Sequence, residues 1–298
     1  MITLKSLAAL AERYGADLDK PVAPVRIGNQ VIDTDRDPVV MATVNLSRDS
    51  SYRESVAVST ESAIRKARLA AAQGAHCVDI GAESTWDGAE KVGIDRQIDQ
   101  LVPVVKPLAA DGIVVSVESY HPEVIEAGLD AGAGIVNHTG AADDHAIFAL
   151  AAQYRATVVL CHGTTANVRV DADATLDDPL REMYELLDAR VEKARAAGVT
   201  EIVLDPGIGF YYANLPDAET RIDYQTRVLA ETFRLRGLGL PVCHALPHAF
   251  DLFEEEFRTA EGFFTVIARL GGTGVFRTHE VPRVVTVLRA MGALALDA

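Results

Sequence analysis

Short apolar runs alternate with longer amphipathic segments along most of the chain. Each run is rich in Val, Ile, Leu and Ala, and is bounded by Gly, Pro or a charged residue. Continuous apolar runs of this kind are typical of strands that are buried on both faces of a parallel sheet. We predict eight such strands, at residues 38–45, 77–83, 113–119, 134–140, 157–163, 202–209, 241–247 and 274–280.

The segments between the strands have helical spacing. Those at 59–75, 121–133 and 179–199 end near Gly, as helices commonly do. Alternating strands and helices predict right-handed βαβ units, and eight units close into a (β/α)8 TIM barrel of the α/β class. An open doubly wound sheet is the alternative, but no G-x-G-x-x-G follows the first strand.

The N-terminal segment and the amino-acid composition indicate the domain organisation and exclude some classes of partner. We expect residues 1–37 to form an extension with one helix and a hairpin (VRIGNQVID), and residues 38–298 to form the barrel. The net charge of −15 argues against a nucleic-acid partner. No apolar run approaches the roughly 20 residues that a membrane span needs. Three cysteines, each inside an apolar run, indicate reduced thiols in a cytoplasmic protein. The expected partner is therefore a small molecule.

A polar or ionisable residue ends every predicted strand. In a barrel these ends converge on one face, and a buried carboxylate or amide costs several kcal/mol unless it is paired. We therefore predict a polar pocket at that mouth, although any single residue could be a cap, a core histidine or, for Asp79, part of a structural ion pair. The residues are Asn45, Asp79, Glu83, Glu118, Asn137, His162, Asp205, His244, His248, Arg277 and His279.

The residue types in this pocket indicate a flat heterocycle with an anionic group. Carboxylates and amides can pair with an N–C–N edge that carries several N–H donors. Arg277 and His279 form a cationic end at the last strand. The loop after the eighth strand is a frequent phosphate site in such barrels.

Six motifs, each near the end of a predicted strand, carry a family resemblance. From about Pro38 to about Met291, the chain resembles dihydropteroate synthase and, more broadly, the pterin-binding barrels that include folate-dependent methyltransferases. The resemblance implies attack of an arylamine on a pterin methylene carbon, with diphosphate as the leaving group. The motifs are VNLSRDS (44–50), VDIGAEST (78–85), SVESY (116–120), AGAGIVNHTG (131–140), LDPGIGF (204–210) and FRTHEV (276–281).

By position, the resemblance gives roles to the pocket residues. Glu118 stands where the family has the Asp of S-V-D-T, which contacts the pterin ring. Asn137 and Asp205 match the residues that hold its pyrimidine edge. The resemblance further implies that Asp79, Thr85, His162 and Arg48 line the substrate pocket.

The diphosphate end has its own set of implied residues. Asn45 resembles the first-strand Asn that meets the diphosphate and a magnesium ion, and Arg277 with His279 matches the R-x-H pair that grips the leaving group. We add His248 to this catalytic set, because an imidazole can exchange protons near neutral pH. The implied cofactor is a pterin or tetrahydrofolate derivative with Mg²⁺, and the family also implies a homodimer.

Departures from the family pattern gather at the diphosphate end. Trp86 replaces the Arg of E-S-T-R-P-G, and the S-R-K-S segment reads Leu246–Ala249 without its Arg and Lys. Arg48 or Arg53 could replace the lost positive charge. On the ring side, S-V-D becomes S-V-E, and the family's N-D becomes Asn137 followed by His138.

These departures leave two other functions open. One is a tetrahydrofolate-dependent one-carbon (methyl or hydroxymethyl) transferase, and the other is a non-catalytic pterin-binding homologue. A third interpretation is a barrel whose likeness is architectural only. His162, His244 and His248 offer three imidazoles near the mouth, which raises a metal site, but their spacing matches no compact metal-ligand motif.

Overall fold

The predicted strands form one parallel sheet that closes into a barrel. In this computed structural model, which describes residues 2–47, 52, 56–57, 59–84, 89–163, 173–209, 212–215 and 217–294, the strand order is β8-β7-β6-β5-β4-β3-β10-β9. A parallel bridge between Leu204 and Val242 joins the two outer strands. The predicted (β/α)8 barrel is confirmed. Its strands are β3 (Val39–Asn45), β4 (Cys77–Gly81), β5 (Val115–Ser119), β6 (Ile135–His138), β7 (Thr157–Cys161), β8 (Ile202–Asp205), β9 (Cys243–Ala245) and β10 (Val275–Thr278).

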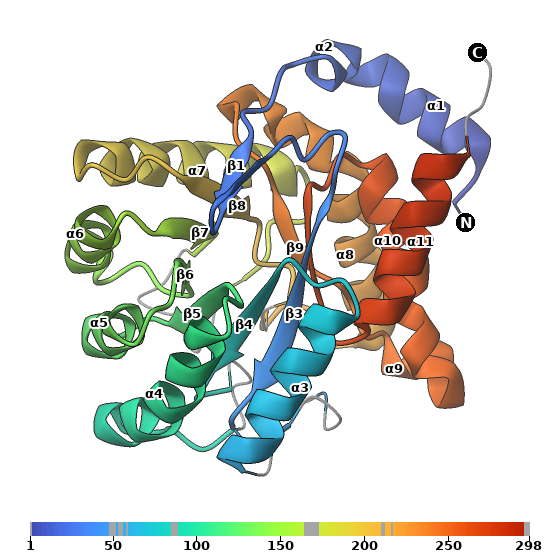
Figure 1. Ribbon diagram of the computed structural model, residues 1–298. Helices are drawn as coiled ribbons and strands as arrows, with labels where there is room; N and C mark the ends of the chain where they lie inside the picture. Colours follow the sequence, from blue (N-terminus) through green and yellow to red (C-terminus); the bar gives the residue numbers. More distant parts are fainter. Residues whose placement is uncertain are drawn as a thin grey trace.

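Helices surround the barrel, as Figure 1 shows. Their starts follow from local sequence: Ser59 caps α3 by accepting a hydrogen bond from the Ser62 amide, and Pro179 fills the first turn of α7. The helices are α3 (Thr60–Ala72), α4 (Ile94–Ala110), α5 (Pro122–Asp130), α6 (Asp144–Tyr154), α7 (Pro179–Ala196), α8 (Ala218–Glu231), α9 (Phe250–Phe253), α10 (Ala260–Leu270) and α11 (Val281–Ala293), with 3-10 segments η2 (Thr232–Leu238) and η3 (Glu254–Thr259).

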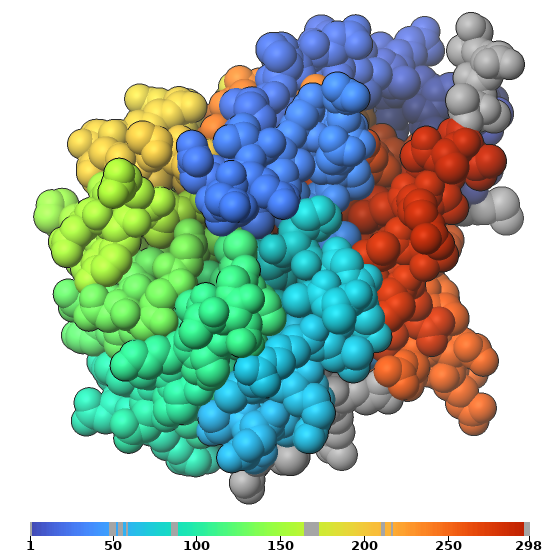
Figure 2. Space-filling view, in the orientation of Figure 1, coloured from blue at the N-terminus to red at the C-terminus, as the bar shows by residue number. Residues whose placement is uncertain are grey.

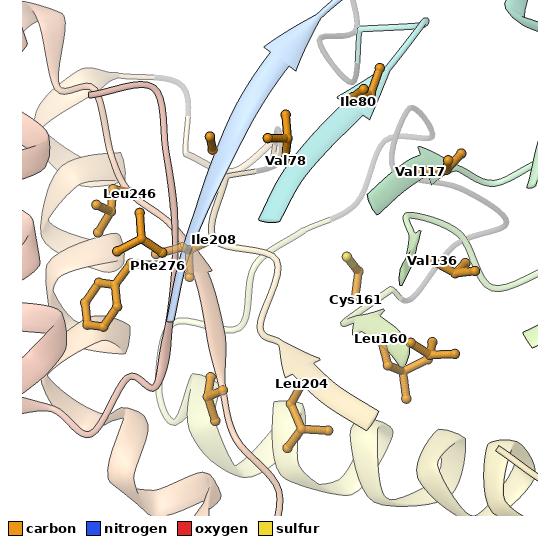
Figure 3. Packing of buried hydrophobic residues seen from close by; sticks show 14 of the residues in the cluster. Val78, Ile80, Val117, Val136, Leu160, Cys161, Leu204, Ile208, Leu246 and Phe276 are labelled. Atoms are coloured by element: carbon orange, nitrogen blue, oxygen red, sulfur yellow. The ribbon is translucent and has the colours of Figure 1, made fainter. Parts of the chain in front are cut away.

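Alternate residues of each strand face the helices or the barrel interior. The outward residues belong to the large core between sheet and helices, where Val78, Ile80, Val117, Val136, Leu160, Leu204 and Phe276 are seen in Figure 3. A second, smaller core fills the barrel interior near the amino-terminal ends of the strands. Its strand residues are Val39, Met41, Cys77, Ile135, Val159, Val203, Cys243 and Val275.

The N-terminal extension closes the end of the barrel at which the strands begin. Helices α1 (Leu4–Arg13) and α2 (Gly15–Leu18) lead into an antiparallel hairpin of β1 (Val25–Ile27) and β2 (Gln30–Ile32), as predicted. Its buried Val25, Ile27 and Ile32 pack on the smaller core, so they exclude water from the end opposite the polar mouth. Figures 1 and 2 show this segment, in blue, lying across that end.

The hairpin turn requires a glycine. Gly28 has φ +62°, and a Cβ atom there would lie 2.6 Å from Val114 Cγ2.

Within the described residues, no helix has the length and apolar character that crossing a bilayer would take.

Candidate active site

The barrel interior changes from apolar to polar toward the carboxyl ends of its strands. The inward positions above the smaller core form a set that we call the inner layer. Several of its contacts join strands that are not neighbours in the sheet, so these contacts cross the interior. The inner layer consists of Asp79, Ser116, Glu118, Asn137, Cys161, Asp205 and Arg277.

Asp79 organises the inner layer from β4. Its side chain is fully buried, and its Oδ1 accepts a hydrogen bond from Ser116 Oγ at 2.7 Å. Its Oδ2 accepts one from Asn137 Nδ2 at 2.9 Å and lies 3.3 Å from Arg277 Nη1. Charge-assisted bonds of this kind are roughly twice as strong as neutral ones. Asp79 therefore forms the structural ion pair that the sequence left open, and it fixes both Asn137 and Arg277.

Glu118 reaches the same guanidinium from β5. Its Oε2 lies 3.8 Å from Arg277 Nη1. Gly81 faces it on β4, and a Cβ atom at Gly81 would lie 3.1 Å from Glu118 Oε2. The missing side chain at Gly81 thus makes room for a Glu that is one methylene longer than the family's Asp. Burial raises the pKa of Glu118 to about 7; nearby Arg277 opposes the shift, and Asp79 adds to it.

Asp205 presents an unpaired acceptor at the end of β8. Its side chain is buried, and Oδ1 accepts a hydrogen bond from the Gly207 amide at 2.8 Å. No described residue donates a hydrogen bond to Oδ2. Burial raises the pKa of Asp205, and the positive charge of Arg277 works in the opposite direction. An unsatisfied buried acceptor costs about 1–3 kcal/mol, so this oxygen is suited to an N–H donor from a bound molecule.

A second group, which we call the mouth cluster, joins His248 after β9, Glu261 on α10 and His279 after β10. Glu261 is 1% exposed, and its Oε2 accepts hydrogen bonds from the Thr278 hydroxyl and from the backbone amides of His279 and Glu280. Its Oε1 lies 3.1 Å from His279 Nδ1 and 3.4 Å from His248 Nδ1. The carboxylate therefore ties three separate segments together.

Electrostatics keep the mouth carboxylate ionised. Burial by itself would raise the pKa of Glu261, but the neighbouring imidazoles of His248 and His279 hold it well below its ordinary range. Burial lowers the pKa of His279, although Glu261 opposes that shift. A neutral imidazole that donates to a carboxylate accounts for both directions.

Tyr52 covers the mouth cluster. Its ring stacks on His279 with centroids 4.5 Å apart and lies 4.8 Å from the His248 ring. Its hydroxyl donates a hydrogen bond to Glu280 Oε1 at 2.6 Å. Phe250 and Phe257 add further aromatic contacts to Tyr52. These rings shield the imidazoles from solvent.

Comparisons with known proteins identify the family of the chain. The family model described as "Pterin binding enzyme" matches residues 41–279, which is most of the chain. The chain belongs to this family. It is similar to the dihydropteroate synthases of Synechocystis sp. (30% identical over 283 residues, covering 91% of this chain and 95% of the relative) and Bacillus subtilis (30% over 269 residues, 86% and 88%).

Solved structures agree with the sequence relatives. Dihydropteroate synthase of Xanthomonas albilineans with 4-aminobenzoic acid superposes with TM-score 0.75 at 28% identity, covering 92% of this chain and all of that one. The Thermus thermophilus enzyme in complex with 6HMPPP gives TM-score 0.70 at 26% identity, covering 91% and 100%. The predicted family is therefore confirmed, and the chain is a dihydropteroate synthase-like transferase.

Some relatives are much longer. A probable bifunctional folylpolyglutamate synthase/dihydropteroate synthase of Haloferax volcanii is 30% identical over 252 residues. The chain covers only 29% of that protein's length. The similarity therefore concerns one part of a longer relative.

One of the three imidazoles that the sequence placed near the mouth lies elsewhere. The prediction was wrong for His244, which is buried among outward-facing positions and whose Nε2 lies 2.8 Å from Thr232 Oγ1 on η2. Burial lowers its pKa to about 3. His162 follows the inward Cys161 and is buried, and its backbone amide donates a hydrogen bond to the Asp205 carbonyl at 2.6 Å. No described residue shares a hydrogen bond with either of its ring nitrogens, so its predicted role in the substrate pocket stays a prediction. Burial, followed by the charge of Arg190, lowers the pKa of His162 to about 4.

His138 also has a structural role. Its Nε2 lies 2.9 Å from Asp144 Oδ1, and Asp144 pairs in turn with Arg190. Arg190 donates further to the backbone carbonyls of Gly140 and Cys161. His138, which replaces the Asp of the family's Asn-Asp pair, is thus part of a polar network with Asp144 and Arg190 on the helix side of β6 and β7. The position of Asn137 does not depend on this replacement.

Other predicted residues lie at the rim. Asn45 is half-buried as the last residue of β3, and its backbone carbonyl accepts a hydrogen bond from the Ala57 amide at 2.8 Å. Thr85, Trp86, Arg48 and Arg53 lie outside the described residues.

Sequence reasoning missed three members of these groups, Ser116, Cys161 and Glu261, and the Tyr52 ring that covers the mouth cluster. Ser116 and Cys161 could have been found from strand alternation, because each lies two residues from another inward position. Cys161 Sγ lies 3.5 Å from Asn137 Oδ1. Glu261 lies on a helix and Tyr52 in a loop, and neither position carries a periodic pattern that points to the mouth.

Proposed function

We propose that this protein transfers the pterin methylene group of a dihydropterin diphosphate to the amino nitrogen of 4-aminobenzoate. The bond from the arylamine nitrogen to the methylene carbon forms as the carbon–oxygen bond to diphosphate breaks. The bonding electrons leave with diphosphate, and the amine nitrogen loses a proton. The observation that carries this proposal is the buried Oδ2 of Asp205 within the inner layer, to which no described residue lies in hydrogen-bonding geometry, although the Cys161 thiol is near enough to lower the pKa of this carboxyl.

The inner layer suits the ring of such a substrate. Asp205 Oδ2 would accept an N–H of the N–C–N edge, and Asn137 offers the donor and acceptor of a second contact. Asp79 holds the Asn137 amide in one orientation, so the ring would meet a preorganised partner. Glu118, on β5, would contact the ring from another side of the barrel than Asp205, on β8.

Arg277 and His279 would hold the leaving group. Arg277 uses Nη1 for Asp79 and Glu118, and a guanidinium carries further N–H donors that can meet an anion. Burial works against the charge of Arg277, but Glu118, Asp79 and Asp205 raise its pKa, so it stays cationic. A fixed cation at the developing negative charge lowers the barrier to departure.

Asn45 fits a magnesium ion that accompanies diphosphate. Mg²⁺ prefers oxygen ligands and commonly takes one or two from the protein beside substrate phosphates and waters. The Asn45 side chain offers an amide oxygen of this type at the rim. The ion would neutralise part of the diphosphate charge.

Turnover of dihydropterin diphosphate with 4-aminobenzoate tests the proposal. We expect formation of dihydropteroate with equimolar diphosphate, and strong loss of that activity in Asp205→Asn. No product at high enzyme concentration, with pterin still bound, would favour the non-catalytic homologue. Methyl transfer from a methyltetrahydrofolate would favour the one-carbon transferase instead.

We also infer a cytoplasmic location, because all three cysteines are free and buried, as in proteins of reducing compartments. The homodimer stays a prediction from the family.

A further inference from the structure

We propose that the mouth cluster binds a divalent transition-metal ion such as Zn²⁺. One ligand atom each from His248, Glu261 and His279 lie within 4.8 Å of one another. Two imidazoles and one carboxylate, with further positions open, form a donor set that zinc and ferrous sites use.

The Glu261 carboxylate is already oriented for this role. Its Oε2 is anchored by the Thr278 hydroxyl and by the amides of His279 and Glu280. Its Oε1 faces the Nδ1 atoms of both histidines. Hydrogen bonds that orient a ligand in this way commonly strengthen metal binding, because the ligand loses little freedom when the ion arrives.

His248 supplies the observation that most favours a metal ion. Its Nδ1 is buried, and no described residue shares a hydrogen bond with it, although Glu261 Oε1 lies only 3.4 Å away. An ion between them would give His248 Nδ1 a partner, while Glu261 Oε1 already has one in His279 Nδ1. The His248 and His279 side chains are 22% and 14% exposed, which leaves room for a ligand from the mouth.

The chemical environment favours a borderline metal over magnesium. Mg²⁺ prefers an all-oxygen, octahedral set, whereas imidazole nitrogen suits Zn²⁺, Cu²⁺ and Fe²⁺. The aromatic rings of Tyr52 and Phe250 lie beside the imidazoles, and Phe257 packs on both rings, so the local dielectric is low.

The ion would serve an anionic ligand, and this step rests on the proposed function. His248 stands in the segment that lacks the cationic side chains of S-R-K-S. A metal ion held there, beside His279, restores positive charge where the diphosphate would leave. We therefore infer that the open coordination positions take diphosphate oxygens.

Cobalt binding tests the site without any turnover. The chelator-treated full chain is titrated with Co²⁺, followed by visible absorption, and Zn²⁺ is then added as competitor. We expect one Co²⁺ per chain, displaced by Zn²⁺. His248→Ala should weaken binding more than about 100-fold, because losing a ligand costs more than losing the partner of one. Exposed His145, on α6, gives the matched control His145→Ala, which should bind as the wild type does.

Glu261→Gln is a second variant that keeps the side-chain shape. Circular dichroism checks that this variant folds. The substitution should also weaken Co²⁺ binding. Equal Co²⁺ binding by wild type, His248→Ala and Glu261→Gln would overturn the site. Absence of Co²⁺ absorption in the wild type would overturn it as well.

Calorimetry with inorganic diphosphate tests the anion role. Zn²⁺ should strengthen diphosphate binding at least about tenfold, or roughly 1.4 kcal/mol, in the wild type and not in His248→Ala. Metal binding that leaves diphosphate affinity unchanged would overturn the anion role. Co²⁺ binding without synthase turnover would contradict the proposed function alone, whereas full turnover after chelation, with no Co²⁺ binding, would contradict the metal site alone.

Discussion

The inner layer and the mouth cluster solve the burial of charge in different ways. The inner layer places three carboxylates, Asp79, Glu118 and Asp205, around the guanidinium of Arg277. The mouth cluster places one carboxylate, Glu261, against two imidazoles and several backbone amides. The first group has an excess of acceptors and suits a ligand rich in N–H donors. The second has an excess of donors and suits a cation-assisted anion.

The largest expected effect comes from removing the cation of the inner layer. Arg277→Ala leaves buried carboxylates without their partner, which costs about 3–5 kcal/mol. Urea unfolding near neutral pH measures this loss. Arg181→Ala is the matched control, because Arg181 is 75% exposed in its pair with Glu185 and should cost less than about 1 kcal/mol. Equal losses for both variants would show that Arg277 does not hold the inner layer together.

Removing the charge of the unpaired acceptor should affect binding more than stability. Asp205→Asn keeps an oxygen for the Gly207 amide but replaces the second oxygen with a donor. Pterin affinity should fall more than tenfold, or at least about 1.4 kcal/mol, by calorimetry with a hydroxymethylpterin. Asp188→Asn, at an exposed position of α7, should leave affinity unchanged. An unchanged affinity in Asp205→Asn would place the ring elsewhere.

The difference between the two groups also decides what the sequence could predict. Asp79, Asn137, Asp205 and Arg277 lie on strands, and barrel topology brings strand ends to one face whatever the loops do. Their convergence was therefore predictable. Glu261 reaches the mouth because the first turn of α10 lies beside the carboxyl end of β10, where Thr278 and the His279 amide donate to it, and no local pattern encodes that placement.

The error at His244 has a different cause. A strand points alternate side chains to opposite faces, so a shift of one residue moves a side chain from the interior to the helix layer. His244 lies between Cys243, which packs in the interior, and Ala245. Strict alternation applied to this strand would have placed the imidazole outside, where Thr232 binds it.

The free energy of unfolding, measured as a function of pH, tests the ionisation of Glu118 in the inner layer. Burial raises the pKa of Glu118 from 4.5 to about 7, so the folded protein holds this proton more tightly than the unfolded chain does. Stability from Glu118 is present below about pH 4.5 and is lost as pH rises through about 7, by up to about 1.4 kcal/mol per pH unit. Glu118→Gln removes this loss, so its free energy of unfolding should rise relative to wild type between about pH 5 and about pH 8.

Exposed Glu126 on α5 gives the control Glu126→Gln, which should follow the wild-type pH dependence. Parallel curves for Glu118→Gln and wild type would mean that Glu118 ionises at its ordinary pKa in the folded protein.

The smallest effect comes from the glycine that makes room for Glu118. In Gly81→Ala the new Cβ would lie 3.1 Å from Glu118 Oε2, so the carboxylate must move by a few tenths of an ångström. Stability should change by less than about 1 kcal/mol, while pterin affinity should fall a few-fold, because a preorganised contact is displaced. Gly134→Ala is the control, since a Cβ there meets no atom within 4 Å. Combining Gly81→Ala with Glu118→Asp should restore affinity, because the shorter acid needs less room. If the double variant binds pterin no better than Gly81→Ala does, then Gly81 is not needed to make room for the Glu118 side chain.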